Sequence, residues 1–323
     1  MGYDSQLRIP IIELPLMNSE DMVRGTDKWQ SLCKRVREAC ENFGCFEVVY
    51  DKISSHLKEE TFSSIRQFFD LPLETKKKYV NPKPYHGYYE VLGLLSSLSE
   101  SIGLEHASNF NSLKSFSQLM WPNGHDHFCQ SISTMMKQLE ELSEMIGLMI
   151  VDSYGLGEEA AESFLKHYML LRLMKYLAPP SGEYTNALIP HTDKCSSALL
   201  CEDQIAGLEI ETKDGQWVKV FPSPGSFVFM VGDILMAWSN RRMHAVKHRV
   251  MMKGKKDRYS FAAFAIPVEG SIIKAPKELV DEDHPQVFRD FDYTDFFNFS
   301  YSEEMRYFDS SKKLFVYAAQ PIN

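Results

Sequence analysis

The chain has 323 residues, of which 44% are hydrophobic, 12% aromatic and 24% charged. A chain of this length and composition can bury a large core, which excludes an intrinsically disordered protein. Its 35 basic and 44 acidic residues give a formal net charge of −9, so we do not expect it to bind nucleic acid.

The cysteines and the N-terminus point to a cytoplasmic protein. None of the six cysteines forms a C-x-x-C pair, so we expect reduced core thiols rather than disulfides or a zinc site. Asp4 and Arg8 stand where a signal peptide would need an apolar run, and no segment is apolar and long enough to cross a membrane.

Residues 1–165 have a mostly helical pattern after a short strand at 8–14. Apolar residues recur at helical spacing from an N-cap at Thr26 to a C-terminal Gly44, and a strand follows at Cys45–Tyr50. Two further helices are predicted at 55–69 and at 127–154, and the Pro-containing segment between them is predicted to be an irregular loop.

From about residue 167 the pattern changes to strands. Strands are predicted at 167–177, 226–231 and 259–267, and residues 207–220 alternate around Asp214-Gly215, which is a strong hairpin signal. We therefore predict an α+β fold with a sandwich or jelly-roll core. We divide the chain into a helical region at 1–165, a core at 166–270 and a helical cover at 271–323, which together form one compact unit.

Three residues form a candidate metal site. His191 and Asp193 are two positions apart beside a predicted strand, so their side chains share a face, and His248 comes from a distant strand. Two histidines and one carboxylate are the ligands of non-haem Fe(II) oxygenases, in which three coordination positions stay open for a co-substrate and O₂. An H-x-D tripeptide by itself also occurs often by chance.

A second group strengthens this interpretation. Arg258 and Ser260 share one face of a predicted strand that begins ten residues after His248. A buried guanidinium needs an anionic partner, and a guanidinium beside a hydroxyl suits the carboxylate of a ligand. Tyr176, near the end of an upstream strand, could add another hydroxyl.

Two other clusters contain possible metal ligands. His244 and His248 would present two zinc ligands on a helix, but the catalytic glutamate of H-E-x-x-H is missing and a strand would separate them. His125-Asp126-His127 lies in a loop before a helix, where we expect a helix cap instead of a metal site.

Several motifs together resemble the plant 2-oxoglutarate/Fe(II)-dependent dioxygenases, over nearly the whole chain. They are Phe43-Gly44-Cys45-Phe46, Pro190-His191-Thr192-Asp193, Gly232-Asp233, Trp238-Ser239-Asn240, His248-Arg249-Val250 and Arg258-Tyr259-Ser260. The stretches FGCFEVVYDKIS, NPKPYHGY, QLMWPNG and RLMKYLAPP resemble the AOP-like subgroup, whose members produce alkenyl and hydroxyalkyl glucosinolates.

This resemblance implies a double-stranded β-helix (jelly roll) flanked by helices. It implies that His191, Asp193 and His248 bind iron, and that the distal carboxylate of 2-oxoglutarate is bound by three residues, Arg258, Ser260 and Tyr176. The chain departs from the family at Met174, where asparagine is frequent, and at residues 50–52, where Tyr-Asp-Lys replaces Asn-His-Gly. The retained Asp193 argues against a halogenase.

The substrate pocket is less well marked. We take Phe264, Arg172 and Tyr88 as candidate substrate residues, with core packing as the alternative for Phe264, while Tyr88, like its neighbours Tyr85 and Tyr89, could equally pack a loop onto the sandwich. For Asp233 and Asn240 we prefer a turn or supporting role.

The resulting hypothesis is an Fe(II)- and 2-oxoglutarate-dependent oxygenase that oxidises a small plant specialised metabolite. We expect hydroxylation, with O₂ consumed and with succinate and CO₂ as co-products, and leave dealkylation and desaturation open. We also expect ascorbate to support activity, a monomer, and no membrane partner. The alternative is a jelly-roll metal-binding protein or isomerase without oxygen chemistry, which would have no need of Arg258 and Ser260.

Overall fold

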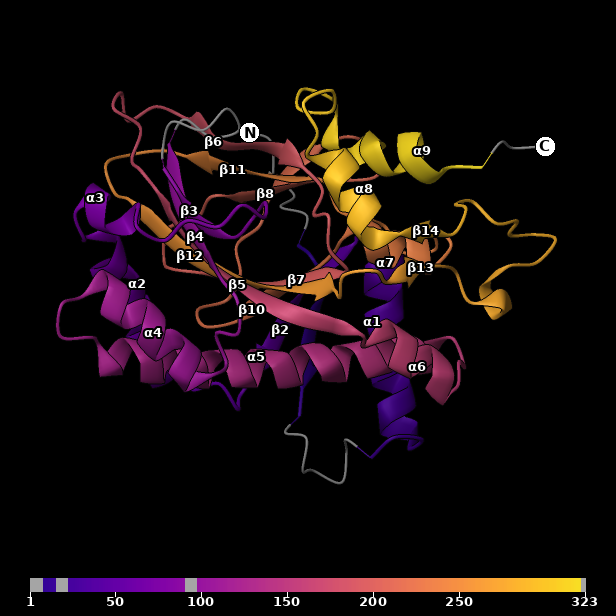
Figure 1. The fold of residues 1–323 in the computed structure, drawn as a ribbon. Coiled ribbons are helices and arrows are strands. Elements are labelled where there is room, and N and C mark those ends of the chain that lie inside the picture. Colours follow the sequence, from indigo (N-terminus) through magenta and orange to yellow (C-terminus); the bar gives the residue numbers. More distant parts are fainter. Residues whose placement is uncertain (1–7, 16–22, 91–97, 321–323) are drawn as a thin grey trace, which may run out of the picture.

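Two β-sheets face each other at the centre of the computed structural model, which describes residues 8–15, 23–90 and 98–320 (Figure 1). The larger sheet has the strand order β1-β2-β10-β7-β12-β5-β4-β3, and the smaller has the order β6-β11-β8-β9. The larger sheet contains β1 (Ile11–Leu14), β2 (Cys45–Tyr50), β3 (Gly87–Tyr89), β4 (Ser99–Leu104), β5 (His167–Tyr176), β7 (Ser197–Glu202), β10 (Phe227–Val231) and β12 (Arg258–Pro267).

The smaller sheet contains β6 (Thr185–His191), β8 (Leu208–Glu211), β9 (Trp217–Lys219) and β11 (His248–Met252). Strands β1 and β2 pair in parallel, and the other pairs in both sheets are antiparallel. A short pair, β13 (Ile272–Ile273) and β14 (Phe291–Asp292), lies outside the two sheets.

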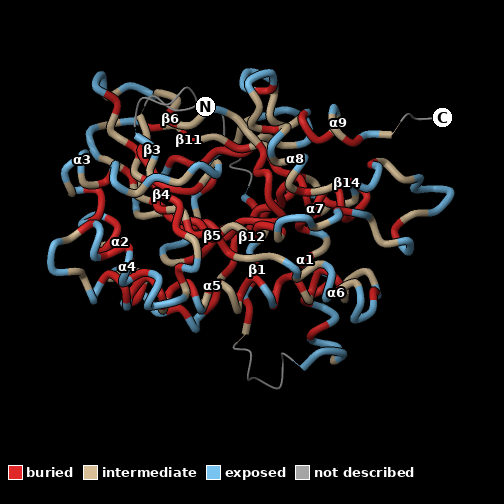
Figure 2. Tube along the Cα trace, in the orientation of Figure 1, coloured by how far each residue is buried: buried red, intermediate tan, exposed pale blue. Residues whose placement is uncertain are grey.

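Helices cover the outer face of the larger sheet. The longest, α5 (Asp126–Ser153), runs beneath this sheet in Figure 1 and packs against α1 (Asp27–Asn42), α2 (Ser55–Phe69) and α4 (Phe110–Met120). Figure 2 shows that their buried residues gather toward the sheet, where Leu171 and Leu173 of β5 belong to the same hydrophobic cluster as these helices. The remaining helices are α3 (Leu73–Lys76), α6 (Glu158–Phe164), α7 (Asp233–Trp238), α8 (Tyr293–Ser300) and α9 (Lys313–Ala318).

The inner face of the larger sheet carries the alternate residues of each strand. On β5 and β12 these are the even-numbered positions, and Met174, Tyr176 and Ala262 pack there with Leu208 and Val250 of the smaller sheet. At one end of this interior, α8 and α9 cover the sheet with an aromatic cluster. On β5 and β12, therefore, side chains at odd-numbered positions face the helices and those at even-numbered positions face the space between the sheets.

Most elements predicted from periodicity are confirmed. The structure has helices at Asp27–Asn42, Ser55–Phe69 and Asp126–Ser153 and a hairpin of β8 and β9 around Asp214-Gly215, and Thr26 caps α1 by accepting the amide hydrogen of Trp29. The irregular loop predicted between 69 and 127 is wrong in part, because this segment contains β3, β4 and α4. Helices α6 and α7 were also not predicted, since each is only about two turns long and too short to show a period.

The six cysteines are buried and free, as expected. Within the described part of the chain, no helix is both long and apolar enough to cross a bilayer.

Candidate metal centre and surrounding site

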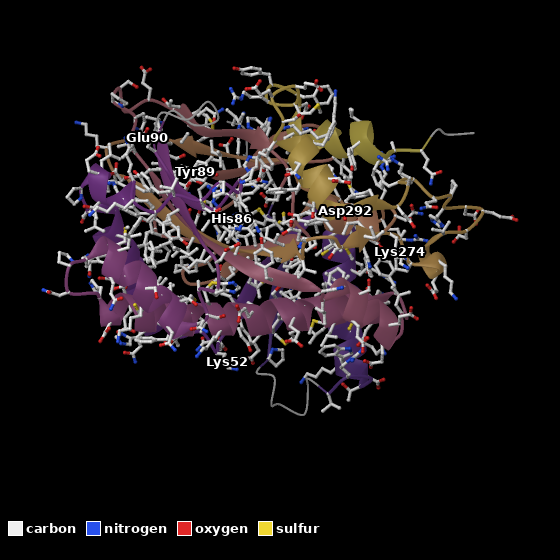
Figure 3. All side chains as sticks on the ribbon, viewed as in Figure 1. Lys52, His86, Tyr89, Glu90, Lys274 and Asp292 are labelled. Carbon is white, nitrogen blue, oxygen red and sulfur yellow. The ribbon has the colours of Figure 1, made fainter. Side chains whose placement is uncertain are left out.

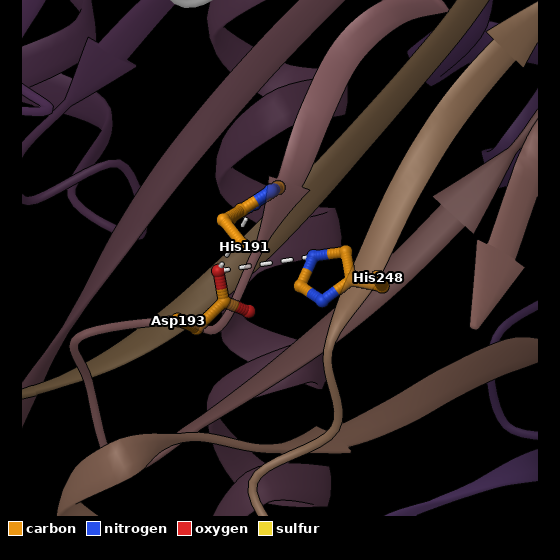
Figure 4. A group of neighbouring side chains, drawn as sticks. All are labelled: His191, Asp193 and His248. Atoms are coloured by element: carbon orange, nitrogen blue, oxygen red, sulfur yellow. Dashed lines mark ion pairs between the residues drawn. The ribbon is translucent and has the colours of Figure 1, made fainter. Parts of the chain in front are cut away.

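The smaller sheet brings two histidines side by side. His191 is the last residue of β6 and His248 the first of β11, and the two are direct partners in the antiparallel register. The register shifts just after His248, between His248 and Val250. Asp193 follows two residues beyond His191, so all three side chains meet at the end of this strand pair (Figure 4).

The three ligand atoms lie within the reach of one metal ion. Asp193 Oδ1 is 3.8 Å from His191 Nε2 and 4.0 Å from His248 Nε2, and the ligand atoms all fall within 4.8 Å of one another. Two atoms each about 2 Å from a common metal lie at most about 4 Å apart, so a small inward rotation of these side chains would bring all three onto one ion. The metal triad predicted from the sequence is thus brought together in space.

Backbone carbonyls orient both imidazoles. His191 Nδ1 lies 2.9 Å from the carbonyl oxygen of Ile189, and His248 Nδ1 lies 3.1 Å from that of Val246. A proton on Nδ1 would satisfy each carbonyl and leave Nε2 with a free lone pair toward the centre. Burial, followed by the neighbouring His248, lowers the pKa of His191 well below its ordinary value, which favours the neutral ligand form.

The Asp193 carboxylate carries an observation that favours a metal. It is 4% exposed, and its Oδ2 is buried without a hydrogen-bond partner among the described residues. A buried carboxylate oxygen without a partner is costly, and a divalent cation would compensate it. The donor set fits Fe(II), with the remaining coordination positions free for other ligands.

A buried ion pair supports the ligand loop from behind. Lys194 Nζ lies 2.6 Å from Asp233 Oδ2 and also donates to the carbonyl oxygen of Ser310 at 2.9 Å. The amide of Asp233 donates to the carbonyl of Asp193 at 2.9 Å. Gly232 allows this approach, since a Cβ there would lie 2.2 Å from the carbonyl oxygen of Cys195. Asp233 therefore has the supporting role expected from the sequence.

The second predicted group also assembles between the sheets. Arg258 is 1% exposed, and its guanidinium lies 3.3 Å from Ser260 Oγ and 5.0 Å from the ring centroid of Tyr176. The hydroxyl of Tyr176 donates to the sulfur of Met174 at 3.5 Å, so the residue that departs from the family pattern contacts this group directly. Burial raises the pKa of Tyr176.

Arg258 also has a carboxylate partner that the sequence did not reveal. Its NH2 atom is 2.5 Å from Oε2 of Glu202, the last residue of β7. Glu202 pairs with Ser260 in the β7–β12 register, which places both side chains on the inner face. An acid at an inward position of a strand otherwise made of apolar and small residues was the signal available in the sequence.

Arg172 lies on the same inner face of β5, without such a partner. Its NH2 donates to Ser101 Oγ at 2.7 Å, and its guanidinium lies 4.8 Å from the ring centroid of Tyr85 and 5.9 Å from that of Tyr89, labelled in Figure 3. Its Nε is buried without a hydrogen-bond partner, and no carboxylate of the described chain forms an ion pair with it. Arg172 is close enough to the triad for its charge to help lower the pKa of His191, after the larger effects of burial, His248 and Lys194.

An aromatic cluster adjoins Arg172. The Tyr85 ring stacks on Phe264 at 6.2 Å and contacts Tyr301 and Phe297 from the C-terminal region at 5.2 and 5.9 Å. Burial, followed by the charge of Asp193, raises the pKa of Tyr85, which therefore stays a neutral phenol. Phe264 packs at this cluster, as well as against the core.

Tyr88 is not part of this cluster, which corrects the sequence-based choice. It pairs with Ile102 in the β3–β4 register and faces the helices, where its hydroxyl lies 2.5 Å from Glu100 Oε2. Tyr85, in contrast, lies beside Arg172 and Phe264. Because the sequence predicts a loop for this segment, it gives no strand alternation from which to orient the tyrosines.

The competing metal sites are not formed. His244 lies in the coil before β11 and not on a helix, and it is outside the cluster of ligands. His125 is the N-cap of α5, accepting the Phe128 amide hydrogen at 3.1 Å, as expected. The Asn240 side chain bonds backbone groups of Leu279 and Val287 and so holds a loop in place.

Comparisons with known proteins agree with this geometry. Residues 167–267 match the 2OG-Fe(II) oxygenase superfamily, and residues 9–106 match the N-terminal region described as non-haem dioxygenase in morphine synthesis. The probable 2-oxoglutarate-dependent dioxygenase AOP1.2 of Arabidopsis thaliana is 38% identical over 315 residues, which are 96% of each chain. The 2-oxoglutarate-dependent dioxygenase AOP2 of the same plant is 30% identical and aligns with 91% of this chain and 95% of its own.

Two solved structures share the fold over nearly the whole chain. The rice dioxygenase for auxin oxidation has a TM-score of 0.80 and 29% identity, covering 97% of this chain and 100% of its own. The structure of JOX2 in complex with 2OG, Fe and JA has a TM-score of 0.79 and 25% identity, covering 97% of this chain and 90% of its own.

Proposed function

This chain belongs to the 2OG-Fe(II) oxygenase superfamily, and we propose that it hydroxylates a small anionic metabolite at a centre formed by His191, Asp193 and His248. That it is a 2-oxoglutarate-dependent dioxygenase acting on small molecules follows from its relatives, and the predicted jelly roll and AOP-like resemblance are confirmed. The alternative of a jelly-roll isomerase without oxygen chemistry receives no support from them.

The single observation that carries the assignment of the centre is the triad geometry. Three ligand atoms lie within 4.8 Å of one another, and Asp193 Oδ2 is buried without a partner. Fe(II) bound there with 2-oxoglutarate supplies the chemistry that converts O₂, the co-substrate and a substrate C–H bond into succinate, CO₂ and an alcohol. The protein residues bind the reactants, orient them and exclude water.

Arg258, Ser260 and Tyr176 are the proposed contacts of the distal carboxylate of 2-oxoglutarate. The guanidinium and the two hydroxyls lie together on the inner face of the barrel, where burial strengthens charge-assisted hydrogen bonds. The unpartnered Nε of Arg258 supports this assignment, because it leaves one donor for a ligand.

Arg172 is the proposed contact of an anionic group on the substrate. It is a cation beside the triad without an ion-pair partner in the described chain. The rings of Tyr85 and Phe264 next to it suit an apolar or aromatic body. Relatives described as acting on auxin, or bound to JA, are compatible with this class of substrate.

The test is to measure succinate formed from 2-oxoglutarate by the purified protein with Fe(II), ascorbate and a panel of small plant acids and their neutral esters. We expect slow succinate formation without substrate, stimulation by an acid but not by its ester, and a product heavier by one oxygen atom. We also expect ascorbate to prolong activity and the enzyme to act as a cytoplasmic monomer. Absence of succinate while iron is bound would contradict the proposal.

A further inference from the structure

The proposed co-substrate anchor is already neutralised by a residue of the chain itself. Arg258 NH2 lies 2.5 Å from Glu202 Oε2, and the Arg258 and Glu202 side chains are 1% and 8% exposed. At this burial the pair is poorly screened by water, so its attraction is strong. A ligand carboxylate that approaches this guanidinium therefore meets the negative charge of Glu202 as well as the positive charge of Arg258.

The remaining contacts of Arg258 leave one of its donors unused. NH1 lies toward Ser260, and Nε is buried without a partner among the described residues. Gly207 lies directly beside this edge of the guanidinium, and a Cβ there would be 3.1 Å from Nε. Glu202 thus occupies one nitrogen, while another donor of the same group is left unused.

We propose that Glu202 is an internal counter-ion that sets the affinity of the enzyme for 2-oxoglutarate. It neutralises Arg258 when no co-substrate is bound and opposes the distal carboxylate when 2-oxoglutarate binds. This inference rests on the proposed role of Arg258 as the anchor. Glu202 is a positioning residue, because it acts on the co-substrate through Arg258 and through its own charge.

The surroundings of Glu202 indicate that its carboxylate is held mainly by the ion pair with Arg258. Burial raises the pKa of Glu202, and the positive charge of Arg258 partly offsets that increase. Glu202 also lines a cavity of about 720 Å³ on the side of the barrel near α2. Other charged residues of both signs line this cavity: Lys58, Glu59, Arg66, Asp203, Lys256 and Asp257. Glu202 therefore lies beside a polar space as well as beside Arg258.

The experiment measures binding without turnover, using Mn(II) in place of Fe(II) and excluding oxygen. Isothermal titration calorimetry gives the Kd of 2-oxoglutarate and of pyruvate, a 2-oxo acid that lacks the distal carboxylate. The variant Glu202→Gln keeps the shape of the side chain and removes its charge. We expect it to bind 2-oxoglutarate about 10-fold more tightly and to bind pyruvate with an unchanged Kd.

Glu209→Gln is the matched control. Glu209 is 3% exposed and forms a similar pair with Arg249 at 2.8 Å, on the smaller sheet. Loss of the Glu209–Arg249 ion pair should destabilise the protein without changing the Kd of 2-oxoglutarate or of pyruvate. If Glu202→Gln does not fold, Glu202→Asp withdraws the carboxylate by one methylene group and should tighten 2-oxoglutarate binding by a smaller factor.

The outcomes separate the two proposals. If 2-oxoglutarate does not bind the wild type, or binds Arg258→Met equally well, the proposed anchor is wrong. If binding depends on Arg258 but Glu202→Gln binds 2-oxoglutarate with the same or a weaker affinity, the counter-ion role is overturned while the anchor stands. Equal tightening of pyruvate would also overturn it, because pyruvate has no distal carboxylate for Glu202 to repel.

Discussion

The two arginines inside the barrel, Arg258 on β12 and Arg172 on β5, differ in their ion pairing. Both lie on the inner face of the larger sheet, and each has an unpartnered Nε among the described residues. Arg258 has a buried carboxylate 2.5 Å away, whereas the contacts of Arg172 within the described ranges are a hydroxyl and aromatic rings. A cation that is already neutralised binds an anion by exchange, while one without a counter-ion gains more from a ligand that supplies it. The difference is what the proposed roles would require if Arg258 binds the co-substrate and Arg172 binds the substrate.

Both proposed roles depend on a metal centre formed by Asp193 and the two histidines. Asp193→Ala tests for this centre, and its expected effect on succinate formation is the largest. Removing a metal ligand should lower succinate formation to below about 1% of wild type, since even changes outside the ligand set cost about 10- to 100-fold. Bound metal per chain and succinate are measured together. Asp214→Ala, in the exposed β8–β9 turn, is the control and should leave both unchanged. Full activity in Asp193→Ala would place the centre elsewhere.

Arg258→Met tests the neutralised member of the pair. Loss of a buried charge-assisted contact costs about 2–5 kcal/mol, so the half-saturating concentration of 2-oxoglutarate should rise about 100-fold. The unpaired Glu202 should also lower the melting temperature, and adding Glu202→Gln should recover part of that loss. An unchanged half-saturating concentration would mean that the distal carboxylate binds elsewhere.

Arg172→Met tests the member without a counter-ion. A hydrogen bond to a charged group is worth about 1.5–3 kcal/mol, so KM for the stimulating acid should rise about 10-fold or more, and the Kd of 2-oxoglutarate should stay within about 2-fold. Arg249→Met, whose arginine lies over Trp217 on the smaller sheet, is the control for loss of a strand arginine. If Arg172→Met weakened 2-oxoglutarate and not the acid, the two arginines would have the opposite roles.

Tyr88→Phe has the smallest expected effect and tests which tyrosine belongs to the site. Because Tyr88 faces the helices and donates to Glu100, the change should cost about 1 kcal/mol of unfolding free energy. It should not alter KM for either substrate. Tyr85→Phe is the contrasting variant, because Tyr85 lies beside Arg172 and a change there should alter KM for the substrate. Denaturant unfolding and steady-state kinetics are measured for both variants.

The site could be predicted from the sequence wherever local spacing fixes geometry. His191 and Asp193 share a face because they are two residues apart, and so do Arg258 and Ser260. The pairing of His191 with His248 is different, because it depends on the register of strands 57 residues apart, as 248 − 191 shows. Motifs that occur together along the whole chain supplied that long-range information, which no single tripeptide carries.

The errors have a physical pattern of their own. Strands β3 and β4 are short, and β4 contains the polar Ser99, Glu100 and Ser101, so it lacks the apolar alternation that reveals a half-buried strand. Tertiary pairing with β5 stabilises β4 despite its composition. The wrong choice of Tyr88 has the same cause, because its orientation depends on strand β3, which the sequence did not predict. Glu202 was missed because an acid at a strand end is ordinarily solvated.

The contact between Lys194 and Ser310 has a consequence for the order of biosynthesis. The nascent chain has all three metal ligands once His248 is made, but Ser310 is added 62 residues later, as 310 − 248 shows. At synthesis rates of about 5–20 residues per second, this leaves a delay of several seconds. The strands can therefore pair, and the metal ligands come together, before the segment that contains Ser310 has left the ribosome.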